Sequence, residues 1–203
     1  MLRLKKVLFA CAHPDDNQYG ACGLILKLIK NAVDVESVVF STCERQPGNK
    51  GITQEWETVV KELGIKKFKI YDFQETKLPK YSDEIREILE GFKKDKISLI
   101  VTHSLDSINQ DHKTVAEECN RVFRNNSMIC YEHIKSEPNF KPNFFVELTP
   151  EEVEKKIRIL MRFKTQHRRY YHKPDLFKSI MRFRGAQAGV KYAEAFEVVR
   201  LIQ

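Results

Sequence analysis

Short apolar runs alternate with longer amphipathic stretches through most of the chain. The run "KKVLFACA" (5–12) is continuous rather than alternating, as expected of a parallel strand buried on both faces. Between such runs, apolar residues recur three and four positions apart, which predicts helices with one buried stripe. Ser82 is predicted to cap one of these helices and Gly64 to end another. The predicted strands are 5–12, 35–41, 67–73 and 97–103, and the predicted helices are 17–31, 53–63, 82–94 and 111–124.

The rest of the chain adds further strands and at least one helix. Strands are predicted at 127–132 and 143–148, and the end of the chain, 195–202, is predicted to be the last strand. The sequence "TPEE" (149–152) is a capping box with proline at the first helical position, which predicts the start of a helix.

This order of elements predicts the fold class. Repeated strand–helix–strand units with short connections indicate an α/β fold with a Rossmann-like, mainly parallel sheet and helices on both faces. No internal repeat, low-complexity tract or linker interrupts the pattern, so we expect a single domain over residues 1–203.

Polar residues capable of metal chemistry follow two of the predicted strands. His13, Asp15 and Asp16 come directly after the first strand, and His112 follows the fourth. In open parallel sheets, ligands bind beyond the carboxyl ends of the strands, where the strand order reverses. If the first and fourth strands are neighbours there, the two distant segments face each other. The alternative is that the first segment is an ordinary polar turn.

Two imidazoles and one carboxylate can hold a divalent metal and leave one coordination position open, as in catalytic zinc sites. The same donors also suit Fe²⁺, so we expect Zn²⁺ without ruling out Fe²⁺. A second carboxylate beside the metal can take a proton from a water whose pKa the metal has lowered. The glycine-rich dinucleotide and P-loop motifs and the GxSxG nucleophile motif do not occur in the sequence.

Three stretches carry a resemblance to a known family. "AHPDD" (12–16), "QDH" (110–112) and "RGAQAGVKYAEAFEVV" (184–199) resemble the PIG-L/LmbE family of zinc-dependent sugar N-deacetylases. The resemblance implies an LmbE-like fold and hydrolysis of the acetamide of N-acetylglucosamine-type substrates. It also implies that His13, Asp16 and His112 are the metal ligands and that Asp15 is the general base.

Two positions depart from the family's pattern. The residue after the aspartates is often glutamate in the family but is Asn17 here, and a histidine often stands where this chain has Asn109. An amide can donate a hydrogen bond to an oxyanion but cannot supply a proton at neutral pH. Either Asp15 returns the proton that it took, or another group such as His103 protonates the leaving amine.

Four residues are candidates for substrate binding, each with a plainer alternative. Arg45 either contacts the substrate or is a solvated loop arginine. His103 either contacts the substrate or only caps the end of a strand. Asn109 is expected to act as an oxyanion donor. Arg184 either anchors the C-terminal helix to the site or pairs with an acid on the surface.

Composition and charge narrow the class of protein and its partners. The chain is 42% hydrophobic and 31% charged, without an apolar stretch long enough to span a membrane. Five cysteines without a CxxC pair indicate reduced core thiols and a cytoplasmic location. The apolar run at 7–12 is too short for a signal peptide.

The formal net charge is +7, and the acid-free run "RFKTQHRRYYHK" (162–173) contributes much of it. This run is either a solvated face or a binding site for an anion: a phosphate-bearing substrate, a membrane surface or nucleic acid.

The function that we predict is removal of an acetyl group from an N-acetylated amino sugar or its conjugate, which makes the protein an amidohydrolase. We expect no nucleic-acid partner, and a homo-oligomer is compatible with the sequence. One alternative is a hydrolase of another amide or ester at the same metal site. The other is a nucleic-acid or phospholipid-binding module that uses residues 162–173 and has a vestigial site.

Overall fold

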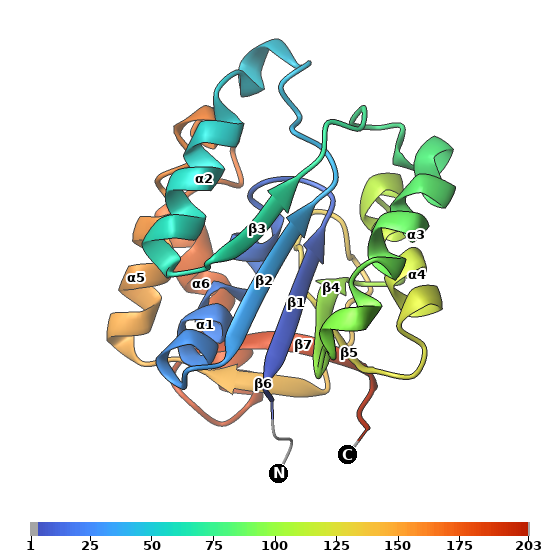
Figure 1. The fold of residues 1–203 in the computed structure, drawn as a ribbon. Helices are drawn as coiled ribbons and strands as arrows, with labels where there is room; N and C mark the ends of the chain where they lie inside the picture. The colour runs from blue at the N-terminus through green and yellow to red at the C-terminus, as the bar shows by residue number, and fades with distance from the viewer. Residues whose placement is uncertain (1–3, 203) are drawn as a thin grey trace.

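The computed structural model describes residues 4–202, which form one mixed sheet covered by helices on both faces (Figure 1). The strands are β1 (Lys6–Cys11), β2 (Asp34–Val39), β3 (Lys67–Ile70), β4 (Leu99–His103), β5 (Ser127–Tyr131), β6 (Phe144–Glu147) and β7 (Ala193–Arg200). The helices are α1 (Asp16–Lys30), α2 (Ile52–Leu63), α3 (Ser82–Glu90), α4 (Gln110–Val122), α5 (Pro150–Leu160) and α6 (Pro174–Gln187).

The sheet has seven strands in the order β3-β2-β1-β4-β5-β7-β6. The first five strands in the chain run parallel, and β7 is antiparallel to both β5 and β6. This confirms the predicted α/β fold with a mainly parallel sheet. The reversed direction of β7 was not predicted, because strand direction depends on the path of the connections between strands.

Helices α1, α2, α5 and α6 pack on one face of the sheet, and α3 and α4 pack on the other (Figure 1). Each face has its own apolar core: Trp56 is fully buried on the first, and Phe40 on the second. All five cysteines are buried and unpaired, as predicted. No helix in the described range, 4–202, is long and apolar enough to cross a membrane.

Some predicted helix boundaries are confirmed and others are wrong: the helix predicted at 82–94, for example, ends at Glu90. Thr149 and Glu152 form the capping box that opens α5, and Gly64 ends α2 with a left-handed φ of 87°. Ser82, the predicted cap of α3, is instead its first helical residue, and its hydroxyl donates to Glu118 Oε1 at 2.6 Å. The Ser82 hydroxyl, which was expected to cap the helix backbone, instead bonds a residue 36 positions away. No bounds were predicted from the sequence for helix α6.

Helix α1 is interrupted near its middle by a break that a distant residue stabilises. Ala21 has a non-helical φ of −142°. The backbone N–H groups of Gly23 and Leu24 donate to the two carboxylate oxygens of Glu194 in β7, at 2.7 and 2.8 Å. Glu194 is itself buried and pairs with Lys156 at 2.7 Å. The break is thus stabilised by a paired carboxylate, and it fixes the segment that carries the first motif to the sheet.

Strands β1 and β4 are neighbours in the centre of the sheet, as the sequence prediction required. Helix α1, which follows β1, crosses to one face, whereas α4, which follows β4, crosses to the other (Figure 1). The two connections diverge at this point and leave a crevice at the carboxyl edge of the sheet.

Candidate active site

The two distant motifs meet at this crevice and bring three potential metal ligands together. One donor atom from each of His13, Asp16 and His112 lies within 4.8 Å of the others. His13 Nδ1 is 3.3 Å from both His112 Nε2 and Asp16 Oδ2, and His112 Nε2 is 3.5 Å from Asp16 Oδ1. The structure therefore assembles the three residues that the resemblance assigned to the metal.

These spacings fit a small divalent cation. Bond lengths near 2.0–2.2 Å and tetrahedral angles put neighbouring zinc ligands roughly 3.3 Å apart. His13 Nδ1 and His112 Nε2 are separated by 3.3 Å, close to that value, and each lies 3.3–3.5 Å from one of the two carboxylate oxygens of Asp16. Two imidazoles and one carboxylate also leave a fourth position for a water or a substrate oxygen. The donor set and its geometry thus suit a catalytic metal.

Asp111 orients the ring of His13. Its buried carboxylate accepts from the backbone N–H groups of Thr76 and Leu78 and lies 3.2 Å from His13 Nε2. An imidazole that donates through Nε2 presents an unprotonated Nδ1 to a metal. Burial opposes protonation of His13, yet Asp16 and Asp111 raise the pKa of this imidazole to about 10. The ring therefore holds a proton in the metal-free protein, which a metal must displace.

His112 is held from two sides. The ring of His103 stacks on it with centroids 3.9 Å apart and an interplanar angle of 16°. On its outer edge, His112 Nδ1 faces Glu137 Oε1 at 4.0 Å. Burial and the neighbouring imidazoles hold the pKa of His112 well below its usual range, so the ring is neutral, as a metal ligand must be.

Asp16 and Asp15 are adjacent but have different environments. Asp16 Oδ2 accepts from the backbone N–H of His13 at 2.7 Å. Although burial opposes its ionisation, the imidazoles of His112, His103 and His13 hold the pKa of Asp16 well below its usual range. Asp15 occupies the N-cap position of α1 without a side-chain capping bond. Burial and the charge of Asp16 raise the pKa of Asp15 to about 6.

The site opens into a cavity of about 380 Å³. Its lining comes from the loops after β1, β2, β3, β4 and β5 and from the segment between α5 and α6. Two non-glycine lining residues, Cys43 and Thr76, have left-handed φ values of 58° and 63°. For Thr76 the conformation has a clear use, because its N–H donates to the carboxylate that orients His13.

Asn109 lines this cavity and also caps α4. Its side-chain oxygen accepts from the backbone N–H of Asp111 at 2.9 Å. The capping bond orients the amide, so the NH₂ group remains available as a hydrogen-bond donor. The structure thus places Asn109 where the sequence comparison with the family expected a polar group.

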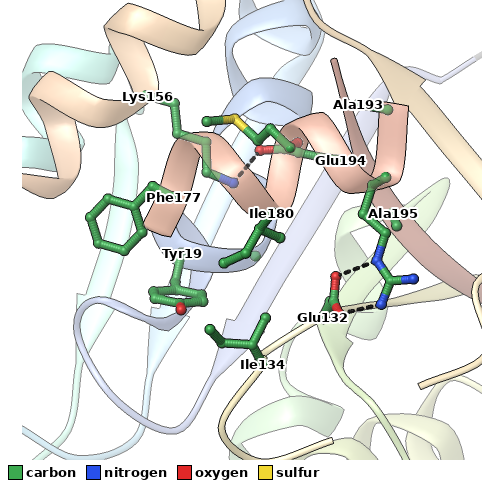
Figure 2. A pocket seen from close by; sticks show the side chains of 12 residues that line it. Tyr19, Glu132, Ile134, Lys156, Phe177, Ile180, Ala193, Glu194 and Ala195 are labelled. Atoms are coloured by element: carbon green, nitrogen blue, oxygen red, sulfur yellow. Dashed lines mark hydrogen bonds and ion pairs between the residues drawn. The ribbon is translucent and has the colours of Figure 1, made fainter. Parts of the chain in front are cut away.

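The other three predicted substrate-binding residues do not line the cavity. Arg45 is exposed and pairs with Asp72 at 3.2 Å. Arg184 pairs with Glu132 beside a separate, small pocket between α6 and the sheet (Figure 2). His103 has no exposed surface, and its Nε2 accepts from the backbone N–H of Ala12 at 3.0 Å. The structure therefore does not support substrate contact by these residues. His103 instead supports the ring of His112.

The pocket in Figure 2 is separate from the active-site cavity but next to it. Two ion pairs border it, Arg184 with Glu132 and Lys156 with Glu194, and Tyr19 points its ring toward Phe177 and Ile134 (Figure 2). Tyr19 connects this pocket to the active site, because its ring also stacks on His133, which lines the active-site cavity, with ring centroids 4.7 Å apart.

His133 and Glu137, both on the loop after β5, are buried site residues that sequence reasoning missed. The His133 ring lines the cavity and packs edge-on against His112 with centroids 5.1 Å apart. Burial lowers the pKa of His133 to about 4, so its imidazole is neutral at pH 7. Neither residue lies at a sequence distance from the two motifs that would indicate a shared site. The one available signal was their position just beyond the carboxyl end of a predicted strand.

The chain belongs to the PIG-L family, which confirms the resemblance seen in the sequence. The model of this family, described as GlcNAc-PI de-N-acetylase, matches residues 8–123, more than half of the chain. The matched region contains His13, Asp15, Asp16 and His112. No curated protein matches the sequence significantly.

Solved structures share the fold over nearly the whole chain. An N,N'-diacetylchitobiose deacetylase from Pyrococcus horikoshii is 21% identical, with a TM-score of 0.80 over 97% of this chain and 84% of that one. A conserved protein from Thermus thermophilus is 14% identical, with a TM-score of 0.83 over 97% and 95%. The 4-carboxy-2-hydroxymuconate hydratase GalB from Pseudomonas putida is 15% identical, with a TM-score of 0.78 over 98% and 99%. At these identities the similarity establishes the LmbE-like fold.

Proposed function

We propose that this protein is a metal-dependent hydrolase that removes the N-acetyl group from an N-acetylglucosamine-type sugar or sugar conjugate. The observation that carries the proposal is the arrangement of four side chains. Three of them can each offer a donor atom within 4.8 Å of the others, and Asp15 lines the same cavity. The family description, a de-N-acetylase, and the deacetylase of similar fold from Pyrococcus horikoshii support the same reaction.

The residues of this chain account for each part of the reaction. His13, Asp16 and His112 would hold a divalent cation, which would supply a water with a pKa lowered to about 7 and a Lewis acid for the acyl oxygen. Asp15 accepts the proton of the attacking water, since its carboxylate faces the cavity without a hydrogen bond to the helix N-terminus. The amide NH₂ of Asn109 donates to the oxygen on which negative charge develops.

The leaving amine must then gain a proton. In the metal-free protein the pKa of Asp15 is raised to about 6, so its carboxyl is mostly ionised at pH 7, and after it has taken the proton of the water it can donate that proton to the amine. His103 is fully buried and lies outside the cavity, which argues against the second donor considered from the sequence. We therefore assign both proton transfers to Asp15.

We infer that the metal is Zn²⁺, because two imidazoles with one carboxylate and an open position are typical of catalytic zinc, although Fe²⁺ accepts the same donors. We also infer a cytoplasmic location, since all five buried cysteines are reduced.

Acetate release tests the proposed reaction. Protein loaded with one equivalent of Zn²⁺, and separately with Fe²⁺, is incubated with N-acetylglucosamine, diacetylchitobiose and N-acetylglucosamine phosphates. We expect acetate and free amine in equal amounts from at least one of them, and none after chelation. Turnover of ester or non-sugar amide substrates alone would instead support a different hydrolase at the same site.

A further inference from the structure

Arg169 is a half-buried cation whose charge has no counter-ion among the residues that the structure describes. It lies between α5 and α6 and lines the same cavity as Asp15. Within residues 4–202 its side chain makes one hydrogen bond, from Nη1 to the hydroxyl of Tyr171, so Nε and Nη2 have no partner there. Arginine is charged at every physiological pH, and a charge removed from water normally has a partner.

The rest of the basic run is used differently. Arg162 pairs with Glu62 at 3.1 Å, Arg168 donates to Asn49 Oδ1 at 3.0 Å, and Lys173 donates to the carbonyl of His167 at 2.9 Å. These side chains hold the segment in place and do not line the cavity. The run is therefore no continuous cationic face, and Arg169 is the cation that it contributes to the cavity.

The backbone that presents Arg169 is firmly attached to the body of the protein. The hydroxyl of Thr165 donates to Glu55 in α2 at 2.7 Å, and the amide of Gln166 donates to Asn49 at 3.3 Å. Arg168 covers Gly48 so closely that a Cβ there would lie 2.4 Å from the guanidinium. The free edge of Arg169 is consequently preorganised, as a recognition group must be.

A second cation lies near the same aromatic ring. Lys135, on the loop after β5, has its Nζ 5.0 Å from the ring centroid of Tyr171, and Arg169 Cζ is 5.7 Å from it. Both side chains line the cavity that contains Asp15 and His133. An arginine edge with two free N–H directions and a nearby ammonium match the charge and donor geometry that bind a phosphate group.

We propose that Arg169 and Lys135 form a subsite for a phosphate group carried by the substrate, so that the protein acts on a phosphorylated N-acetyl amino sugar. The proposal rests on the deacetylase function proposed above, in that the sugar's acetamide must face the metal ligands. The alternative role for Arg169 is to act on Asp15, whose pKa its charge lowers. That role would affect charged and uncharged substrates equally.

Product binding tests the subsite without depending on turnover. Zn²⁺-loaded protein is titrated calorimetrically with glucosamine, glucosamine 1-phosphate and glucosamine 6-phosphate. We expect at least one phosphate to bind about tenfold or more tightly than glucosamine. Arg169→Gln should abolish this advantage and Lys135→Gln should reduce it. Lys164→Gln is the matched control, an exposed cation of the same segment outside the cavity, and should leave the advantage intact.

The outcomes separate this proposal from the function on which it rests. Equal binding of all three ligands would overturn the subsite. So would a phosphate advantage that survives in both Arg169→Gln and Lys135→Gln, which would mean that the phosphate binds the metal instead. If the advantage depends on these residues but no acetylated sugar releases acetate, the subsite stands and the deacetylase proposal fails. Lys135 is exposed, so Lys135→Gln remains informative even if Arg169→Gln does not fold.

Discussion

His112 Nδ1 and Glu137 Oε1 face each other at 4.0 Å, and neither buried atom has a hydrogen-bond partner among residues 4–202. The other oxygen of Glu137 accepts from the backbone N–H of His133. Burial raises the pKa of Glu137 to about 8. A metal on His112 Nε2 places the ring proton on Nδ1, where an ionised Glu137 can accept it. Two unpartnered atoms therefore become one hydrogen bond when the site is filled.

This relationship predicts that Glu137 strengthens metal binding. Glu137→Gln keeps the size of the side chain and an acceptor for His133 but cannot ionise when the metal binds. We expect Zn²⁺ affinity to fall by about tenfold, the lower end of the usual effect of such partners. Competition with a chromogenic chelator measures it. Glu117→Gln, on the exposed face of the same helix as His112, is the control. Unchanged affinity in Glu137→Gln would mean that the carboxylate does not contact the ligand.

Metal binding should also release a proton. Because Asp16 and Asp111 raise the pKa of His13 to about 10, its imidazole is protonated at pH 7.5 in the metal-free protein. The proton competes with the metal, so apparent affinity should increase as pH rises, by about tenfold per unit for each proton released. Calorimetric titration with Zn²⁺ in two buffers of different ionisation enthalpy should show release of at least about one proton. Zero release would show that His13 is neutral before the metal binds.

The dual position of Asn109 allows its two functions to be separated. Asn109→Asp keeps the oxygen that accepts from Asp111 N–H, and a negative charge at a helix N-terminus is favourable, so stability should be retained. The variant lacks the amide donor, which predicts a decrease in kcat of about 10²–10³-fold with unchanged metal content. Thermal unfolding and acetate release measure the two effects. Full activity in Asn109→Asp would remove Asn109 from the reaction.

The sequence predicted the meeting of the two motifs because strand direction alone brings the residues after β1 and β4 to one edge of the sheet. Strand β1 and the start of α5 could also be predicted, because the apolar run and the capping box that indicate them consist of residues close together in the sequence. The assignment of His13, Asp16 and His112 as the ligands came from the resemblance to the family.

The remaining parts of the site depend on long-range pairing, which a single sequence does not encode visibly. Arg45 and Arg184 were predicted from their position in the chain to contact the substrate, but they pair with Asp72 and Glu132 and do not line the cavity. Glu137 lies 25 residues beyond His112 on another loop, so nothing local relates the two. Within the basic run, tertiary contacts alone distinguish Arg169 from its neighbours.

The most direct test of the account compares the same substitution at two adjacent aspartates. Asp15→Asn and Asp16→Asn are loaded with Zn²⁺, and metal content and acetate release are measured on the same preparations. We predict that Asp15→Asn retains about one equivalent of metal and loses about 10²–10⁴-fold in kcat, the usual contribution of a general base. Asp16→Asn should lose metal and activity together. Metal loss in Asp15→Asn with retention in Asp16→Asn would reverse the two roles, and full metal with full activity in both would contradict the site.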